Sequence, residues 1–419
     1  MPEYANTSSL DRAAGTASYD SRRRRMLIFF LTLGGFAIGS SEFIAMGALP
    51  EIAREMDPAA VALSPEIAAG HASVFVWGYA LGVVIGAPIF AMISIRIRQK
   101  TYLVMALTLM AALTIATAIA SPFYLIIVFR ISAALPHGAY FGVGAVVAAR
   151  LLGDAHQARG VAIVLGGLTV ANLIGSPVGT WLAQTISWRL SYLIVGGLFT
   201  VAAIGVFVMM QSDGSGPALR GSARSSRSMW RLSLWRLIGG YAVLNASFFA
   251  VLTFAAPILT DLAHFSTSAV VALMVTIGAG MTIGNYLGGA IADRTAEAAL
   301  WSTVAVAGLG FVAFWLGMLV PGLVFAGFAM CGYSLGAVSP YIQARLARAT
   351  PDNPQLGSSL SSLCGNAGSV VGGLVGSIAV VGTDSMSATI TVGSALFVLG
   401  VAACAALSRG ASPDRAALG

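Results

Sequence analysis

Long apolar segments recur along almost the whole 419-residue chain. Each has about 20 residues, the length of an α-helix that crosses the ~30 Å hydrocarbon core of a bilayer. Polar residues, Pro or Gly separate the segments, and the longest polar interruption, 211–236, falls near the middle. Twelve segments are predicted, namely 26–48, 70–93, 102–120, 123–149, 160–185, 190–210, 237–259, 269–291, 299–319, 322–344, 357–381 and 386–408.

Charged residues are too few for a protein surrounded by water. They make up 9% of the chain, against 57% apolar residues and a mean hydropathy of +0.85, whereas a soluble domain has roughly a quarter charged residues. The sequence predicts an all-α membrane protein with twelve transmembrane helices in two six-helix bundles with pseudo-two-fold symmetry. The expected regions are a disordered cytoplasmic tail (1–25), an N-terminal bundle (26–210), a cytoplasmic central loop (211–236), a C-terminal bundle (237–408) and a cytoplasmic tail (409–419).

The distribution of basic residues indicates the orientation in the membrane. If both termini are cytoplasmic, 20 of the 23 Lys and Arg residues lie in cytoplasmic segments. Such an excess on the inner side is typical of membrane proteins. The net charge of +7 therefore indicates orientation, and we expect no nucleic-acid partner. The three cysteines lie in apolar segments without the spacing of a disulfide framework or metal site, and we expect no metal and no cofactor.

Ionisable residues inside the predicted spans are rare and therefore functional candidates. Glu42 is the only acidic residue well inside a span, and Arg130 is the only clearly intramembrane cation. Each lies about seven residues, or roughly 10 Å, from the outer end of its helix. We expect the two side chains to lie at one depth, where they can pair. His137 follows Arg130 on nearly the same helical face.

Several stretches resemble motifs of a known transporter family. They are GGFAIGSSEFIAMGALPEIAREM (34–56), GAPIFAMISIRIRQK (86–100), FRISAALPHGAYFGV (129–143), GGLTVANLIGSPVGTWLAQTISWR (166–189) and GNYLGGAIADR (284–294). In this order they are similar to the twelve-helix, proton-driven drug and sugar exporters of the major facilitator superfamily. That branch includes arabinose-efflux-like, chloramphenicol-resistance and purine-nucleoside exporters.

The resemblance implies a proton-coupled antiporter that exports small organic molecules from a bacterial-type inner membrane as a monomer. Its partners are a small-molecule substrate, protons and the bilayer. Glu42 is expected to bind the proton and Arg130 to respond to its charge. The loop motifs imply a role in gating for Arg96, Asp293 and Arg294. The antiporter motif of the fifth helix contains Gly175, Pro177 and Gly179. Ile95 stands where the first loop motif normally has Asp. In the resembled family this acid is expected to pair with basic residues across the cytoplasmic gate and so to latch the outward-facing state. The missing acid puts this latch in question for the first half of the chain.

Glycines recur along two predicted helices in equivalent positions of the two halves. Gly166, Gly175 and Gly179 lie near one stripe of the fifth helix, and Gly368, Gly372 and Gly376 do so on the eleventh. Small residues allow close approach of a neighbouring helix. Ordinary helix packing explains the pattern as well as a role in blocking proton leak does.

Polar and aromatic residues stranded in apolar helices are candidates for a substrate cavity. The full set is Ser41, Trp77, His137, Tyr140, Asn172, Asn245, Phe248, Asn285, Tyr333 and Asn366. Helices 1, 4, 7 and 10 line the cavity in the resembled fold, which favours Ser41, His137, Tyr140, Asn245 and Tyr333. For each one a simple interhelical hydrogen bond is an equally good explanation.

Other functions remain open with less support. The only lysine, Lys100, does not follow a glycine-rich loop, so no phosphate-binding loop for ATP is present. One Glu and one His are too few for a membrane-embedded enzyme, and we expect none. An uncoupled facilitator, an uptake carrier for a small polar metabolite and a membrane sensor without transport stay as alternatives.

Overall fold

Every regular element is a helix in the part of the chain that the structure describes. A computed structural model describes residues 20–153, 157–211, 232–349 and 354–410. Helices are what the bilayer requires, because each one satisfies its backbone polar groups within its own segment. The predicted all-α class is therefore confirmed.

The N-terminal half contains six membrane crossings built from several helical segments. Its elements are α2 (Ser21–Gly47), α3 (Leu49–Met56), α4 (Pro58–Leu63), α5 (Pro65–Ala72), α6 (Val74–Ser94), α7 (Gln99–Ile119), α8 (Phe123–Ala134), α9 (His137–Leu152), α10 (Gln157–Val170), η2 (Ala171–Gly175), α11 (Ser176–Leu182), η3 (Ala183–Ser187) and α12 (Trp188–Met209).

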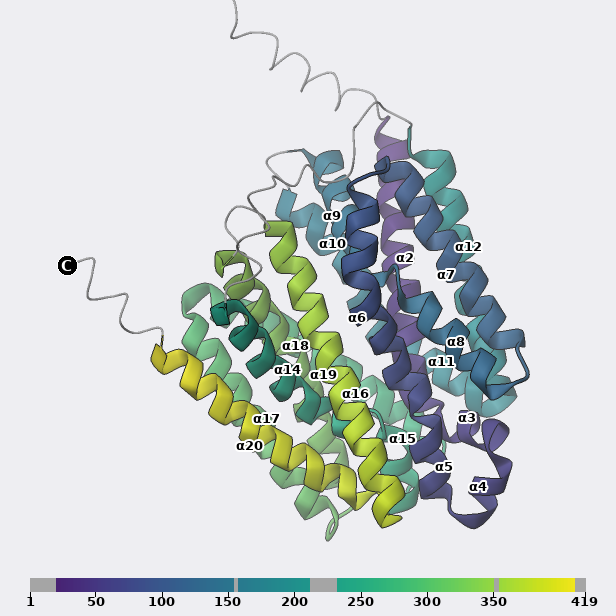
Figure 1. The fold of residues 1–419 in the computed structure, drawn as a ribbon, viewed down its shortest axis with the longest axis vertical. Helices are drawn as coiled ribbons and strands as arrows, with labels where there is room; N and C mark the ends of the chain where they lie inside the picture. The colour runs from purple at the N-terminus through teal and green to yellow at the C-terminus, as the bar shows by residue number, and fades with distance from the viewer. Residues whose placement is uncertain (1–19, 154–156, 212–231, 350–353, 411–419) are drawn as a thin grey trace, which may run out of the picture.

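The C-terminal half contains the other six crossings. Its elements are α14 (Leu232–Leu252), α15 (Ala255–Pro257), η4 (Ile258–Leu262), α16 (Ala269–Arg294), α17 (Ala296–Gly317), α18 (Leu323–Ala349), α19 (Pro354–Thr383) and α20 (Ser387–Gly410). Figure 1 shows the two halves side by side, with the purple-to-teal helices on the right and the green-to-yellow helices on the left.

The number of crossings agrees with the prediction. Eleven stretches of the described chain are long and apolar enough to span a membrane, and the longest, Ala162–Met209, has 48 residues. The extended backbone of Ser187 (φ −172°, ψ 141°) breaks that stretch. Ser191 donates a 2.8 Å hydrogen bond to the carbonyl of Gly179, whereas one continuous helix would hold these residues about 18 Å apart. The chain therefore reverses at Ser187, and the described residues contain twelve crossings.

The first helix begins earlier than the sequence predicted. The predicted disordered tail included Arg22–Arg25, but α2 already starts at Ser21. Arg23 donates hydrogen bonds to the carbonyls of Met209 (2.8 Å) and Val208 (3.1 Å) at the end of α12. A cation is favourable there because the last carbonyls of a helix lack helical partners. Residues 1–19, most of the predicted central loop and residues 411–419 lie outside the described residues.

Several predicted spans are interrupted inside the membrane. Pro136 divides the predicted helix 123–149 into α8 and α9, because proline lacks the N–H that would continue the helix and its ring clashes with the preceding turn. The predicted helix 237–259 also stops short, because α14 ends at Leu252, whereas α2 ends at Gly47, within one residue of its predicted end. A short helical segment follows each of them, so the two halves repeat the same device.

Glycine stripes bring two pairs of helices together, as predicted. A Cβ at Gly179 would collide with the side chain of Ile44 on α2, and a Cβ at Gly372 would collide with the carbonyl of Ala246 on α14. Helix 5 therefore packs closely on helix 1, and helix 11 packs in the same way on helix 7. Gly166 is an exception, because a Cβ there would meet open space.

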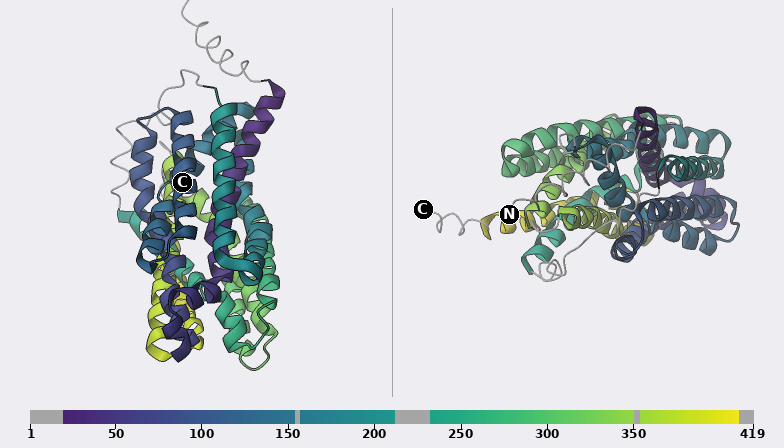
Figure 2. Two further views of the ribbon diagram at one scale, coloured as in Figure 1. Left: turned by 90° about the vertical axis from the view of Figure 1, so that its right-hand side faces the viewer. Right: turned by 90° about the horizontal axis from the view of Figure 1, so that it is seen from above.

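The interface between the halves is formed in part by α6 and α19. A Cβ at Gly373 on α19 would come within 2.8 Å of the Trp77 Cβ on α6, and the two helices lie along each other in Figure 1. In Figure 2 (left) the start of α2 lies at the top of the molecule and α3–α5 lie at the bottom. The two ends of the bundle can therefore be told apart by the start of α2 at one end and by α3–α5 at the other.

Candidate functional site

A cavity of about 210 Å³ lies between the two halves. Elements α2, α9, α10 and η2 line it from the N-terminal half, and α14, α16, α18 and α19 line it from the C-terminal half. The lining includes Gln343 near the end of α18 and Ser361 near the start of α19. The cavity therefore extends from the middle of the bundle toward the end at which α2 begins.

Glu42 lines this cavity from α2. It is the only Asp, Glu, Lys or Arg among the described residues that form the cavity wall. Within the described chain its carboxylate accepts no hydrogen bond and forms no ion pair, since the described ion pairs all join other residues. The cavity thus contains one carboxylate that is free to exchange a proton or to bind a substrate group.

Arg130 lies beside Glu42 but does not bind it. Its Nη1 donates to the Ser41 hydroxyl (2.7 Å), its Nη2 donates to the Ser41 carbonyl (2.6 Å), and its Nε donates to the Phe75 carbonyl (3.2 Å). The side chain is 1% exposed and stays outside the cavity wall. The expected Glu42–Arg130 pair is therefore absent in this conformation, because the guanidinium is held by the residue next to Glu42.

Aromatic rings surround the Arg130 guanidinium on its remaining sides. Its central carbon lies 4.2 Å from the ring centre of Tyr79, 4.8 Å from that of Phe75 and 5.0 Å from that of Tyr192. Aromatic faces attract cations, most strongly where water is excluded. Tyr192 also donates to the Ser41 carbonyl (3.1 Å). This network fixes the backbone of α2 immediately before Glu42.

Two of the five predicted cavity residues line the cavity, namely His137 and Asn245. The ring Nδ1 of His137 lies 3.2 Å from the Tyr79 hydroxyl, which connects the cavity wall to the residues around Arg130. Asn245 donates from Nδ2 to the Tyr241 carbonyl of its own helix (2.9 Å). Whether either residue contacts substrate stays a prediction.

The other three predicted cavity residues lie elsewhere. Ser41 binds Arg130, as described above. Tyr140 is buried and donates to the Leu31 carbonyl (2.8 Å), because Gly34 on α2 leaves room for its hydroxyl. Tyr333 lines a shallow apolar hollow formed by α16, α17 and α18, since α16 packs through Gly284 against the Tyr333 backbone.

Amides on helices 5, 8 and 11 line the cavity instead. They are Asn172 on η2, Asn285 on α16 and Asn366 on α19. The sequence already marked these three as polar residues stranded in apolar helices. They were set aside because the resembled fold favoured helices 1, 4, 7 and 10. For these three residues, their polarity within apolar helices indicated the cavity wall better than the helix positions favoured by the resembled fold.

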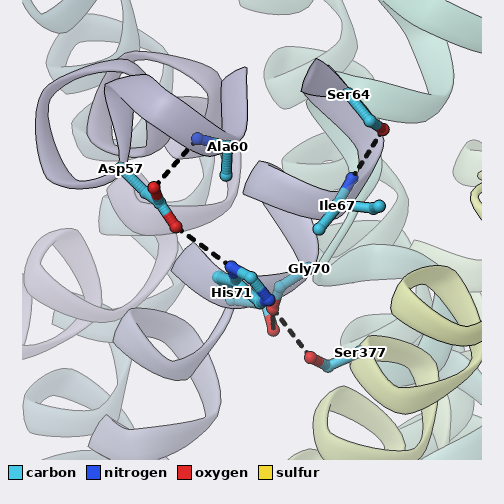
Figure 3. Close-up of polar contacts among 8 residues, drawn as sticks. Asp57, Ala60, Ser64, Ile67, Gly70, His71 and Ser377 are labelled. Carbon is cyan, nitrogen blue, oxygen red and sulfur yellow. Dashed lines mark hydrogen bonds and ion pairs between the residues drawn. The ribbon is translucent and has the colours of Figure 1, made fainter. Parts of the chain in front are cut away.

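The halves meet directly at the end of the bundle that carries α3–α5. Ser377 of α19 donates a 2.7 Å hydrogen bond to the Gly70 carbonyl of α5, as Figure 3 shows. The Ser64 hydroxyl also donates to the carboxylate of Asp384, in the turn after α19. We call this the closed end, defined by Ser64, Gly70, Ser377 and Asp384.

A contact between His71 and Asp57 lies on the N-terminal side of the closed end. His71 Nδ1 lies 3.0 Å from Asp57 Oδ2, and the other Asp57 oxygen accepts from the backbone N–H of Ala60 (3.0 Å). The His71 hydrogen bond, followed by the Ala60 hydrogen bond, holds the pKa of Asp57 below its usual range. Both side chains are partly exposed, so the pair contributes little to stability. The pair joins the start of α4 to α5, the helix that begins after Ser64 and contains Gly70.

The predicted gate residues lie away from the closed end. Arg96, Asp293 and Arg294 are exposed, and their side chains form no hydrogen bond or ion pair with any residue that the structure describes. Ile95, which replaces the motif acid, is 38% exposed at the end of α6. The side chains of Arg96, Asp293 and Arg294 therefore form no latch with the described residues in this conformation. Pro177 is buried in α11 between Gly175 and Gly179, on the helix that packs against α2.

The closed end gives a first testable prediction. Replacing both Ser377 and Asp384 with alanine removes the two contacts across the halves and spares the Ser64 cap of α5, in which Ser64 accepts from the Ile67 N–H. We expect the closed end to open more often. Spin labels at Leu63→Cys and Leu319→Cys, which are 88% and 81% exposed, should report a longer distance population by pulsed electron paramagnetic resonance.

A matched control for this measurement is Thr383→Val. Thr383 donates only to the Ala379 carbonyl of its own helix, so its loss should leave the distance distribution unchanged. The native cysteines Cys331, Cys364 and Cys404 are buried and should not take up label. An unaltered distribution in the double variant would show that these contacts do not keep the end closed.

A family model described as Major Facilitator Superfamily matches residues 31–373. The chain is 32% identical over 353 residues to the inner membrane transport protein YdhP of Escherichia coli O157:H7, covering 83% of this chain and 86% of that protein. It is 29% identical over 273 residues to a chloramphenicol resistance protein of Streptomyces lividans, covering 65% and 67%.

The fold is also similar to that of solved structures. A bacterial homologue of the human lysosomal transporter Spinster, solved in an inward-facing and occupied conformation, superposes with a TM-score of 0.66. The match covers 93% of this chain and 98% of that one at 18% sequence identity. At this identity the likeness concerns the fold alone, and it agrees with two helical halves around a central cavity.

Proposed function

Because the chain belongs to the Major Facilitator Superfamily and is thus a multi-pass membrane transporter and not an enzyme, we propose that it exports small organic molecules in exchange for protons. One observation carries the proposal, namely the unpaired carboxylate of Glu42, the only one among the described residues that line the cavity between the two halves. A carboxylate that gains and loses a proton during the cycle is what proton coupling requires. The similarity to a chloramphenicol resistance protein supports export of drug-like molecules.

Orientation is part of this proposal. With the termini in the cytoplasm, 20 of the 23 basic residues are cytoplasmic, the closed end faces outward and the cavity extends toward the cytoplasm. A bacterial inner membrane fits this arrangement. Each chain contains a complete cavity, so we propose that the monomer is the transport unit.

A labelling experiment tests the orientation. A cysteine at Leu63, on α4, should react with a membrane-impermeant maleimide added to intact cells, because the closed end faces outward. A cysteine at Gly216, in the basic central region of the sequence, should react only after the membrane is opened. Labelling of Gly216→Cys in intact cells would overturn both the orientation and the even number of crossings.

The proposed cycle alternates access from one side to the other. In the conformation seen here, substrate enters the cavity from the cytoplasm and displaces the proton of Glu42. The closed end then opens outward while the halves close on the cytoplasmic side. Arg130 transmits the change, since it holds Ser41 beside Glu42 and rests on rings of α6 and α12. Protonation of Glu42 from outside resets the cycle.

Efflux from cells tests the proposal. The substrate panel consists of chloramphenicol, adenosine, methyl arabinoside and tetraphenylphosphonium, each radiolabelled and preloaded into de-energised cells. On re-energisation, cells that express the protein should lose at least one compound faster than control cells. A protonophore should abolish the difference. A difference that survives the protonophore would favour an uncoupled facilitator.

A further inference from the structure

Two amides of the cavity wall, Asn245 and Asn366, turn their nitrogen toward their own helix. Asn366 donates from Nδ2 to the Ser362 carbonyl one turn earlier on α19 (2.9 Å), and Asn245 does the same with Tyr241 on α14. Each bond directs the amide nitrogen at its own helix. The amide oxygen is therefore the atom left for a partner outside the helix.

Two amide oxygens of the cavity wall, those of Asn172 and Asn366, are buried without a partner among the described residues. Asn172 is 5% exposed and Asn366 is 9% exposed. In both residues Oδ1 is buried and accepts no hydrogen bond from the residues that the structure describes. Leaving a buried acceptor unsatisfied is unfavourable, so both atoms await a donor. Asn172 belongs to the N-terminal half and Asn366 to the C-terminal half, and both line the cavity.

The charge of the wall is one-sided. Glu42 supplies the only formal charge among the described lining residues, and none of them is Lys or Arg. The nearby cation, Arg130, is occupied by Ser41 and Phe75 and does not reach the cavity wall. An anionic molecule in the cavity would meet the Glu42 carboxylate and amide oxygens, and the described lining residues include no cationic Lys or Arg side chain with which it could form an ion pair.

The donors of the wall are few or adaptable. The hydroxyls of Ser339, Ser361 and Ser362 can donate or accept. His137 faces Tyr79 through Nδ1, which leaves its other ring nitrogen for the cavity. These groups can donate hydrogen bonds to acceptor atoms of a substrate. Among the described lining residues, the buried polar atoms without a partner are both acceptors, Asn172 Oδ1 and Asn366 Oδ1.

From these features we infer the substrate class. The cavity takes uncharged or cationic molecules with at least two hydroxyl or amino donors, bound by Asn172 on one side and Asn366 on the other. Such a substrate ties the two halves together, and organic anions are rejected. The inference rests on the proposed function, because it assigns this cavity as the transport site.

Matched probes test the donor requirement directly. One set is phenyl β-D-glucoside, its tetra-O-methyl ether and phenyl β-D-glucuronide. The second is adenosine, its tri-O-methyl ether and adenosine-5′-carboxylic acid. Binding to the purified full chain in detergent is measured by calorimetry. On at least one skeleton the hydroxylated parent should bind at least about tenfold more tightly than both relatives, the ratio expected when one buried hydrogen bond is lost.

Variants assign the effect to the two amides. Asn172→Leu and Asn366→Leu should each weaken binding of that parent about tenfold while leaving the weak binding of the O-methyl ether unchanged. Gln184→Leu is the control, because Gln184 lies in η3 away from the cavity. Thermal melting of each variant verifies that it is folded.

Three results would overturn the inference: tighter or equal binding of the carboxylate or the ether, no binding of either parent, or unchanged parent affinity in both Asn variants. The proposed function fails separately, because the binding assay uses no gradient. Discrimination among probes without proton-driven transport would leave the inference standing and refute the antiporter. Proton-driven accumulation of the carboxylate probes would refute the inference about substrate class and leave the proposed antiporter standing.

Discussion

Replacing Glu42 with glutamine is expected to abolish accumulation of substrate against a gradient. Glutamine keeps the shape of the side chain but cannot ionise, and no other described acidic residue lines the cavity. In proteoliposomes with an acidic interior, the internal level of a transported member of the substrate panel should fall at least about tenfold, to passive equilibration. A one-for-one exchange can accumulate substrate about tenfold for each unit of pH difference, because a tenfold proton ratio corresponds to about 1.4 kcal/mol.

The matched control for this variant is Glu297→Gln. Glu297 is an exposed residue in the first turn of α17, so the same loss of charge there should leave accumulation unchanged. Glu42→Gln should still bind uncharged substrates, because its amide occupies the same volume. Accumulation at the wild-type rate in Glu42→Gln would place the proton site elsewhere or show that transport is uncoupled.

Replacing Arg130 with alanine should both impair transport and destabilise the protein. The change leaves the Phe75 carbonyl and the Ser41 hydroxyl without the donor they have now, and it opens space among three aromatic rings. Each unsatisfied buried group costs about 1–3 kcal/mol. We expect a lower melting temperature in detergent and at least a roughly tenfold lower transport rate, since α2 is no longer held next to Glu42.

Lysine at this position separates charge from geometry. Arg130→Lys keeps the cation, but an ammonium on a flexible stem cannot reproduce the planar fork that holds Ser41 through two nitrogens. Stability should recover in part while transport stays low. Wild-type transport by Arg130→Ala would contradict a coupling role for this network.

The sequence predicted the number and order of the crossings, because a bilayer demands about 20 apolar residues for each helix. The reversal between the fifth and sixth helices was also predicted, and Ser187 supplies it. The interruptions inside the membrane were not predicted. Pro136 lies within an apolar run that satisfies the length criterion, and that criterion takes no account of the proline, although a proline inside a helix is itself a signal for a break.

Side-chain direction was the weakest part of the sequence prediction. A membrane helix contacts lipid on one face and other helices on the opposite face. Both surroundings are apolar, so the periodicity of apolar residues gives little guidance on which face points into the protein. Tyr140 and Tyr333 were therefore placed in the cavity but face elsewhere. The unpaired state of Glu42 was equally inaccessible, because it depends on which partner Arg130 takes in a given conformation.

The most direct test of proton-coupled export is flux through the purified wild-type protein in sealed liposomes. An acidic interior and neutral exterior should drive a donor-bearing member of the substrate panel inward against its own gradient, as outgoing protons exchange for substrate. Adding nigericin, which dissipates the pH difference, should release the excess. If internal and external concentrations only become equal, and nigericin has no effect, the protein is a facilitator and the proposed antiport is contradicted.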